Sequence, residues 1–127
     1  MSYSVIIRCK NEEQWIGHSI QSVIDLLPND TEIIIIDNCS TDDSKNVINL
    51  FLNEKINKIK IKYLNIHEYS PGKAINLGVK ESSNENIMIL SSHCVLTKIN
   101  FNKIQKLLNE NIAIWGKQIP IFKGKKI

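Results

Sequence analysis

The sequence has few cysteines, and the three that it has show no repeated spacing. An odd number of cysteines without a pattern argues against a disulfide framework, so we expect a reducing environment. No apolar stretch approaches the roughly 20 residues that a membrane-spanning helix needs. Residues 1–3 lead directly into a strand-like segment, which is not the pattern of a signal peptide. We therefore expect a cytoplasmic protein that at most lies against the inner face of the membrane.

The chain also lacks a strong charge of either sign. Sixteen Lys and Arg residues against thirteen Asp and Glu residues leave a net charge of +3. This balance gives no reason to expect nucleic acid as a partner, although anionic ligands such as nucleotide phosphates are compatible with it. The sequence shows no internal repeat, low-complexity segment or linker, and 127 residues suffice for one core. We expect a single domain over residues 1–127.

What the sequence does contain is an alternation of strand-like and helix-like apolar patterns. The predicted strands are residues 4–8, 32–37, about 58–63, 87–90 and 112–118, and the predicted helices are residues 12–27, 42–54, 73–80 and 100–109. Strands that alternate with helices indicate an α/β fold with a doubly wound, mostly parallel sheet and helices on both faces. Such a fold is Rossmann-like.

The patterns also predict the order of the strands. Lys58, Lys60 and Lys62 alternate with apolar residues, which is typical of an edge strand that must not pair with other chains. The strands at residues 4–8, 32–37 and 87–90 are apolar on both faces, so we expect them inside the sheet. The order 3-2-1-4 meets these conditions and puts the switch point, where ligands bind in such sheets, between the first and fourth strands.

The end of the second strand has the pattern of a ligand site. Four isoleucines run directly into Asp37, which is followed by small polar residues. An acid at the carboxyl end of a buried parallel strand can accept hydrogen bonds from a base or a sugar. The alternative is that Asp37 is only a turn residue. Asn11 and either Ser40 or Thr41 are good N-caps for the helices that follow, with or without a binding role.

Three motifs resemble the inverting family 2 glycosyltransferases. The segment from Ser4 to Glu13 is similar to their opening strand and Asn-Glu loop, and the segment from Ile36 to Ser44 is similar to their Asp-Asp-Gly-Ser-Thr-Asp motif. The segment from Gly72 to Gly78 is similar to their Gly-x-x-x-x-Asn-x-Gly helix. Together the three motifs cover about the first hundred residues, in the right order.

The resemblance implies a GT-A fold and a bacterial enzyme of surface polysaccharide or glycan assembly. It implies that a sugar passes from a nucleotide-diphosphate sugar to a hydroxyl of a glycan or lipid-linked acceptor, with inversion, usually with help from Mg²⁺ or Mn²⁺. It places Asp37 near the base, Asn11 and Glu12 at the base and ribose, and Lys73 near the nucleotide. With the converging loops, the expected nucleotide contacts are Arg8, Asn11, Glu12, Asp37, Asn38, Ser40, Lys73, Ser91 and Ser92.

The sequence departs from the family at the metal site. The family has Asp-x-Asp after its fourth strand, and this chain has Ser91-Ser92-His93. Hydroxyls are poor ligands for Mg²⁺, whereas an imidazole suits Mn²⁺ and other transition metals. We therefore expect His93 either to hold a metal or to contact phosphate as a cation. A zinc cluster of His93 with the cysteines that follow three strands is a weaker alternative, because Cys-x-x-Cys spacing is absent.

The family's catalytic base normally lies well beyond the fourth strand, so the resemblance implies that this chain is the donor-binding portion of a longer enzyme. The acids left as candidate bases are Glu12, Glu68, Asp42 and Asp43, and of these we favour Glu68, because it lies on a loop outside the nucleotide side and the helix start. The alternative function is a nucleotide-binding module or degenerate relative without independent catalysis. A nucleotidyltransferase is disfavoured because the loop after the first strand has no glycine. We also expect an exposed apolar surface, able to drive self-association, around Trp115, Ile119, Ile121 and Phe122.

Overall fold

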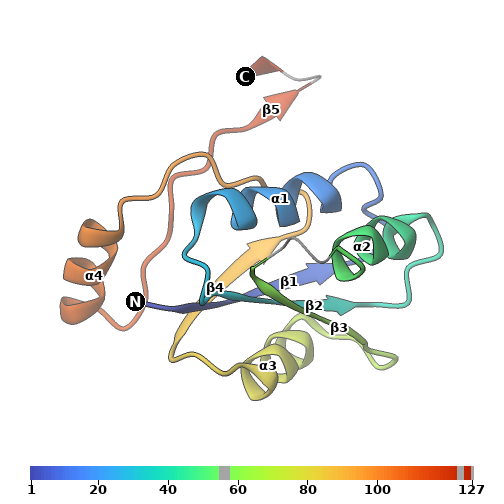
Figure 1. The fold of residues 1–127 in the computed structure, drawn as a ribbon, viewed down its shortest axis with the longest axis horizontal. Coiled ribbons are helices and arrows are strands. Elements are labelled where there is room, and N and C mark those ends of the chain that lie inside the picture. Colours follow the sequence, from blue (N-terminus) through green and yellow to red (C-terminus); the bar gives the residue numbers. More distant parts are fainter. Residues whose placement is uncertain (55–57, 123–124, 127) are drawn as a thin grey trace.

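The computed structural model describes residues 1–54, 58–122 and 125–126. Strands and helices alternate along the chain as predicted (Figure 1). The elements, in chain order, are β1 (Tyr3–Cys9), α1 (Ile16–Leu26), β2 (Glu32–Asp37), α2 (Ser44–Leu52), β3 (Lys60–Asn65), α3 (Pro71–Glu81), β4 (Asn86–Ser91), α4 (Phe101–Glu110), β5 (Ile121–Phe122) and β6 (Lys125–Lys126).

The main sheet has the predicted order β3-β2-β1-β4, and all of its pairs are parallel. Its register sets Arg8 beside Ser91 on one side and beside Ile36 on the other. The interior placement of β4 was wrong. In the part of the chain that the structure describes, β4 is an edge strand, and Ile87 and Ile89 on one of its faces are exposed.

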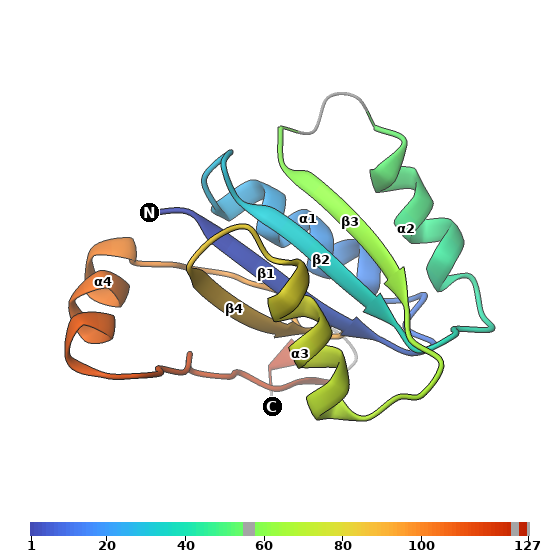
Figure 2. The same cartoon turned by 90° about the horizontal axis from the view of Figure 1, so that it is seen from below.

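The two faces of the sheet are covered by different helices, as Figure 2 shows. Alternate β1 residues, Val5 and Ile7 among them, pack with α1, α2 and β2 in the larger part of the core. Ile6 lies on the opposite face in a smaller cluster with Ala74 of α3. Alternation along β1 therefore puts Arg8, two residues after Ile6, on the face that α3 covers.

α3 packs closely against the sheet because Gly78 has no side chain. A Cβ atom at this position would lie 2.6 Å from Cγ2 of Ile6. The helix begins at Pro71, after Ser70 accepts a hydrogen bond from the Lys73 amide as its N-cap. It packs mainly on β1 and β2, and Ile87 and Ile89 on the same face of β4 stay exposed.

Several predicted boundaries were wrong. α1 starts at Ile16 rather than residue 12, because residues 12–15 form turns in which the Trp15 and Ile16 amides bond to the Glu12 carbonyl. α2 starts at Ser44, and β3 is shifted toward Asn65, so Lys58 precedes it. The predicted strand at residues 112–118 is absent. Instead β5 and β6 form a short antiparallel pair outside the main sheet.

α4 matches its prediction closely, with Asn100 as N-cap accepting from the Lys103 amide. Phe101 at its start packs on the Tyr3 ring, with centroids 5.8 Å apart, which ties α4 to the sheet. Beyond α4, Trp115, Ile119 and Ile121 are exposed as predicted, while the Phe122 side chain lies outside the described residues. In the described part of the chain, no helix is long and apolar enough to span a membrane.

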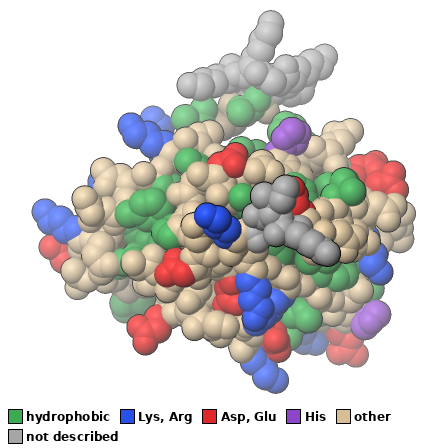
Figure 3. Space-filling view, viewed as in Figure 1, with side chains coloured by type: hydrophobic (Ala, Val, Ile, Leu, Met, Phe, Trp, Pro, Cys, Tyr) green, Lys and Arg blue, Asp and Glu red, His purple; other side chains and the backbone are tan. Residues whose placement is uncertain are grey.

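The charged side chains are mixed over the surface that Figure 3 shows, where Lys and Arg alternate with Asp and Glu. This mixture agrees with the small net charge of +3. On this face, therefore, charge does not gather into one large basic area of the kind that binds a nucleic-acid backbone.

Candidate functional site

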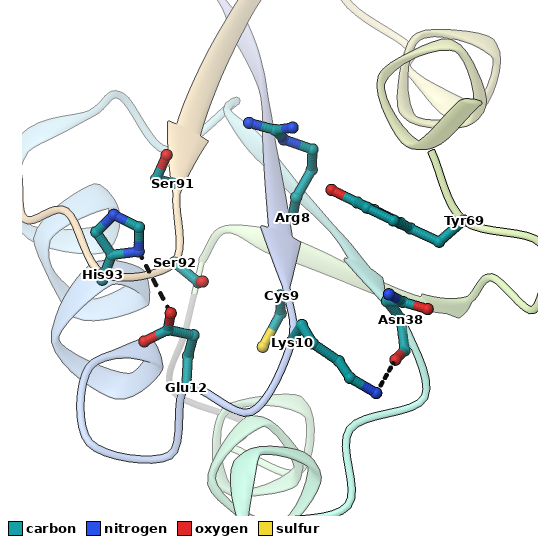
Figure 4. Close-up of a pocket in the computed structure, with 9 residues that line it drawn as sticks. All are labelled: Arg8, Cys9, Lys10, Glu12, Asn38, Tyr69, Ser91, Ser92 and His93. Carbon is teal, nitrogen blue, oxygen red and sulfur yellow. Dashed lines mark hydrogen bonds and ion pairs between the residues drawn. The ribbon is translucent and has the colours of Figure 1, made fainter. Parts of the chain in front are cut away.

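A pocket of about 250 Å³ opens at the carboxyl ends of β1, β2 and β4, where the switch point was predicted (Figure 4). Strand residues and the loops after the strands form most of its wall, and the loop before α3 completes it. Its lining residues are Arg8, Cys9, Lys10, Glu12, Asn38, Tyr69, Ser91, Ser92 and His93.

The loops after β1 and β2 hold each other through a ladder of hydrogen bonds. The Asn11 amide donates to the Ser40 hydroxyl at 2.9 Å, and the Glu12 amide donates to the Ser44 hydroxyl at 2.8 Å. In return, the Thr41 amide donates to the Asn11 side-chain oxygen at 2.7 Å. The predicted caps were therefore wrong. The Asn11 side chain accepts from the Thr41 amide of the neighbouring loop, and the Ser40 hydroxyl accepts from the Asn11 amide and donates to Asp37 of its own loop.

This ladder requires unusual backbone at two positions. Asn11 has φ 50° and Cys39 has φ 48°, both in the left-handed region that few residues other than glycine adopt. Asparagine tolerates this region better than most residues, because its short side chain bonds locally. The two turns bring the loops together and define one rim of the pocket.

Asp37 is buried at the end of β2, with 1% of its surface exposed, and both of its oxygens have partners. Oδ1 accepts from the Ser40 amide and hydroxyl, and Oδ2 accepts from the Tyr63 hydroxyl at 2.7 Å. Burial and the hydrogen bond to the Asp37 carboxylate raise the pKa of Tyr63 well above its usual value. Asp37 thus fixes the turn that presents Asn38 to the pocket.

Lys10, which directly follows β1, bonds to the same loop after β2. Its Nζ donates to the carbonyl oxygens of Asn38 and Cys39, at 2.9 Å and 3.1 Å. This lysine, with its alkyl chain along the pocket wall, is one of the residues that the sequence reasoning missed (Figure 4). Its position after a strand was visible in the sequence, but its bonds depend on how two loops meet.

Arg8 occupies the opposite wall, beside β4. Its buried Nε has no hydrogen-bond partner within the described part of the chain. Ser91 is its register partner on β4, and Ser92 is buried at the start of the following turn. The Tyr69 ring, a second residue that sequence reasoning missed, turns its hydroxyl end toward Arg8 (Figure 4).

Glu12 and His93 meet across the pocket. The Glu12 Oε1 atom and the His93 Nδ1 atom are 3.3 Å apart, in a hydrogen bond that is also an ion pair when the imidazole is protonated. His93 therefore lines the pocket. The pair offers one carboxylate and one imidazole, and the described residues contain no group of three or more metal-ligating side chains.

The cysteines do not form a cluster. Burial and the charge of Asp37 raise the pKa of the Cys9 thiol to about 11, so it is neither a ready nucleophile nor a ready metal ligand. Cys39 instead contacts His67, with Sγ and Nδ1 separated by 3.4 Å. The zinc alternative with His93 thus has no support in the described residues.

The pocket gathers six of the ten residues predicted for nucleotide or metal, namely Arg8, Glu12, Asn38, Ser91, Ser92 and His93. The other four lie elsewhere. Asn11, Asp37 and Ser40 belong to the loop ladder behind the wall. Lys73 is exposed at the start of α3, where its Nζ pairs with Glu68 at 3.5 Å.

Parallel strands with helices on both faces, and a pocket at the switch point of the sheet, define an α/β protein with a ligand site at the carboxyl ends of its strands. Residues 4–126 match the family model described as glycosyl transferase family 2. The chain belongs to this family.

The chain is similar to proteins several times its length. It is 26% identical to the poly(ribitol-phosphate) beta-N-acetylglucosaminyltransferase TarS of Staphylococcus aureus, over 87% of this chain and 19% of TarS. It is 32% identical to a glycosyltransferase of Rickettsia bellii, over 89% of this chain and 16% of that protein. The chain thus spans less than a fifth of the length of these relatives.

Solved structures agree on the fold. The structure of TarS residues 1–349 from S. aureus in complex with UDP-GlcNAc superposes with a TM-score of 0.72 at 22% identity, over 95% of this chain and 37% of that one. A mannosyltransferase of Pyrobaculum calidifontis, in complex with GDP-Man and Mn²⁺, superposes with a TM-score of 0.67 at 19% identity, over 73% of this chain and 28% of that one. The fold is the GT-A fold, as the sequence resemblance implied.

Proposed function

We propose that this chain binds a nucleotide-diphosphate sugar and supplies the donor side of an inverting glycosyltransferase. The observation that carries the proposal is the pocket at the switch point, lined in part by residues of two of the segments that resemble family 2 glycosyltransferases, Ser4 to Glu13 and Ile36 to Ser44. Its wall combines a guanidinium, hydroxyls and an amide side chain, which suit phosphate oxygens and the polar edge of a nucleoside.

In this proposal the loops after β1 and β2 hold the nucleoside. Asn38 presents its amide at the rim, and the ladder behind it keeps this loop in place. Direct contacts of Asn11, Asp37, Ser40 and Lys73 with the nucleotide remain predictions. The Asp37 carboxylate already accepts hydrogen bonds from Ser40 and Tyr63. These contacts support a role in holding the loop in place.

The side chains that could act as metal ligands suit a divalent cation only in part. Glu12 and His93, 3.3 Å apart, would hold it, together with phosphate oxygens of the donor. An imidazole ligand favours Mn²⁺ over Mg²⁺. A bound cation supplies neutralisation of charge on the leaving diphosphate. Within the chain itself, Arg8 on the pocket wall beside β4 supplies positive charge that can neutralise the diphosphate.

The name of TarS suggests which donor to test first. TarS is an N-acetylglucosaminyltransferase and has been solved with UDP-GlcNAc. We propose UDP-GlcNAc as the first donor to test here, and a glycan or lipid-linked hydroxyl as the acceptor class. Cytoplasmic placement, peripheral membrane contact and self-association belong to the same proposal.

A second candidate function is donor binding without transfer by these 127 residues alone. Inverting transfer needs a base within hydrogen-bond reach of the acceptor hydroxyl. Of the residues that line the pocket, Glu12 is the acid, and it is bonded to His93. Glu68 is exposed and paired with Lys73, and its neighbour Tyr69 rather than Glu68 lines the pocket.

The test of the function combines binding with transfer. We expect UDP or UDP-GlcNAc to raise the melting temperature of the chain, because a ligand that binds only the native state stabilises it. GDP serves as the competing nucleotide, with Mn²⁺ or EDTA in parallel samples. No stabilisation by either nucleotide would contradict the proposal, and efficient sugar transfer abolished by Glu68→Gln would contradict the second candidate and identify the base.

A further inference from the structure

Arg8 is the cation of the pocket whose hydrogen-bonding capacity is not used within the described protein. Its Nε is buried and has no partner. A buried donor without a partner lowers stability, since it has given up water and gained nothing in exchange. Such groups are rare in folded proteins and call for an explanation. Because Arg8 lines the pocket, a ligand acceptor that reaches its guanidinium is the direct explanation.

The other cations near the pocket have partners. Lys10 donates to two backbone carbonyls, Lys73 pairs with Glu68, and His93 bonds to Glu12. An anionic ligand would have to displace these contacts, whereas Arg8 can bind one at no such cost. The position of Arg8 is also fixed, because it extends from a central strand next to the well-packed Ile6 and Ile7.

The groups around Arg8 suit the same ligand. Ser91 lies beside it in the register of β1 and β4, and the Ser92 hydroxyl and the Tyr69 hydroxyl belong to the same wall (Figure 4). Hydroxyls donate to phosphate oxygens and do not repel them. The nearest acid of the lining, Glu12, is turned toward His93.

We propose that Arg8 anchors the diphosphate of the donor through parallel hydrogen bonds of its guanidinium, beside Ser91 of the Ser91-Ser92-His93 segment that stands where the family carries Asp-x-Asp. The planar guanidinium matches phosphate geometry in two bonds, which an ammonium cannot do. This inference rests on the proposed function and adds the residue that recognises the leaving group. It makes diphosphate binding depend on Arg8 whether or not a divalent cation is present.

The experiment measures affinities by calorimetry for UDP, GDP and inorganic pyrophosphate, in EDTA and in Mn²⁺. The variants are Arg8→Gln, Arg8→Lys and, as a control that removes one exposed charge far from the pocket, Lys60→Gln. We expect Arg8→Gln to weaken the binding of the diphosphates about 10- to 100-fold in both conditions, as for lost hydrogen bonds between charged groups. The affinity of Arg8→Lys should lie between those of Arg8→Gln and the wild type, and the affinity of Lys60→Gln should match that of the wild type.

A second readout separates binding from folding. Because Nε is unpaired without ligand, Arg8→Gln should leave the melting temperature of the ligand-free chain unchanged or raise it. Wild-type affinity of Arg8→Gln for a nucleotide that the wild type binds would overturn the inference while leaving the proposed function intact. If pyrophosphate binds through Arg8 but no nucleotide binds, the proposed function fails and the anion site stands. Absence of binding by all three probes overturns both.

Discussion

Two buried carboxylates lie at the two ends of β2, and each organises one end of the sheet. Asp37 ties the site loop to Tyr63 of β3. Glu32, at the other end, accepts from the Ser4 hydroxyl at 2.6 Å and from the Ser83 amide, and Lys62 lies 3.7 Å away. The sequence indicated that an acid ends this strand. Only the structure shows that both Asp37 oxygens are occupied, by Tyr63 of β3 and by Ser40 of the loop after β2.

The contacts of Asp37 predict an effect on stability as well as on binding. Asp37→Asn should lower the free energy of unfolding by about 1.5–3 kcal/mol, the range for hydrogen bonds to a charged group. Denaturant unfolding of the ligand-free protein measures this. Tyr63→Phe, which removes one of the donors, should have a smaller effect. An Asp37→Asn variant with the wild-type free energy of unfolding would show that the network does not support the loop.

The Glu32 network makes stability depend on pH. Burial would raise the pKa of Glu32, but hydrogen bonds from Ser4 and Ser83 and the charge of Lys62 lower it below the ordinary 4.5. Since the folded-state pKa is the lower one, the stabilisation is complete above the unfolded-state value and is lost as pH falls through the folded-state value. Glu32→Gln should therefore be less stable by about 1–3 kcal/mol at pH 7.

Unfolding experiments across the acid range check this prediction. The difference between wild type and Glu32→Gln should shrink as pH falls below 4.5, the ordinary value for glutamate. A difference that stays constant from pH 7 to pH 3 would mean that the charge of Glu32 contributes nothing.

At the scale of elements, the sequence predicted the strand order and four helices, because apolar periodicity and buried strands determine them. Helix starts were harder. Asn11 and Ser40 have the residue types of caps, yet their side chains bond to each other's loops. A hydrogen bond between loops about 30 residues apart leaves no local pattern in the sequence. The same holds for Lys10 and Tyr69, which join the pocket only through tertiary packing.

Two glycines of α3 provide a matched test of helix packing. Gly78→Ala puts a Cβ within 2.6–2.9 Å of three Ile6 side-chain atoms, so α3 or Ile6 must move. We expect a loss of about 1–3 kcal/mol in the free energy of unfolding, as for other overpacked cores. At Gly72 nothing lies within 4 Å of an added Cβ, so Gly72→Ala should be neutral or slightly stabilising. Equal effects of the two would contradict the packing.

At the scale of the whole molecule, the exposed apolar residues mark unpaired surfaces. β4 is an edge strand of the described sheet, and Ile89, the register partner of Ile6, is 51% exposed on the same face of the sheet as α3. Trp115, 93% exposed, lies on the segment after α4. The sequence predicted the exposure of Trp115, Ile119 and Ile121 correctly, but it placed β4 inside the sheet, because two apolar faces are typical of interior strands.

These surfaces predict concentration-dependent self-association of the 127-residue chain. Ile89→Lys should reduce it, because a charge at the uncovered strand opposes edge pairing and apolar contact. Val79→Lys on α3, an exposed apolar residue outside both surfaces, is the matched control and should leave association unchanged. Sedimentation over a range of concentrations provides the measurement. A wild-type chain that stays monomeric would refute the prediction.

The most direct test of the account is a titration of the isotope-labelled chain with UDP, followed by NMR. We expect the largest amide shifts at the carboxyl ends of β1, β2 and β4, at Arg8, Asn38, Ser91 and Ser92, with little change in α4. Arg8→Gln should weaken the titration without changing the set of residues that shift. Shifts confined to other regions, or no shifts at millimolar UDP and GDP, would contradict the claim that this pocket binds a nucleoside diphosphate.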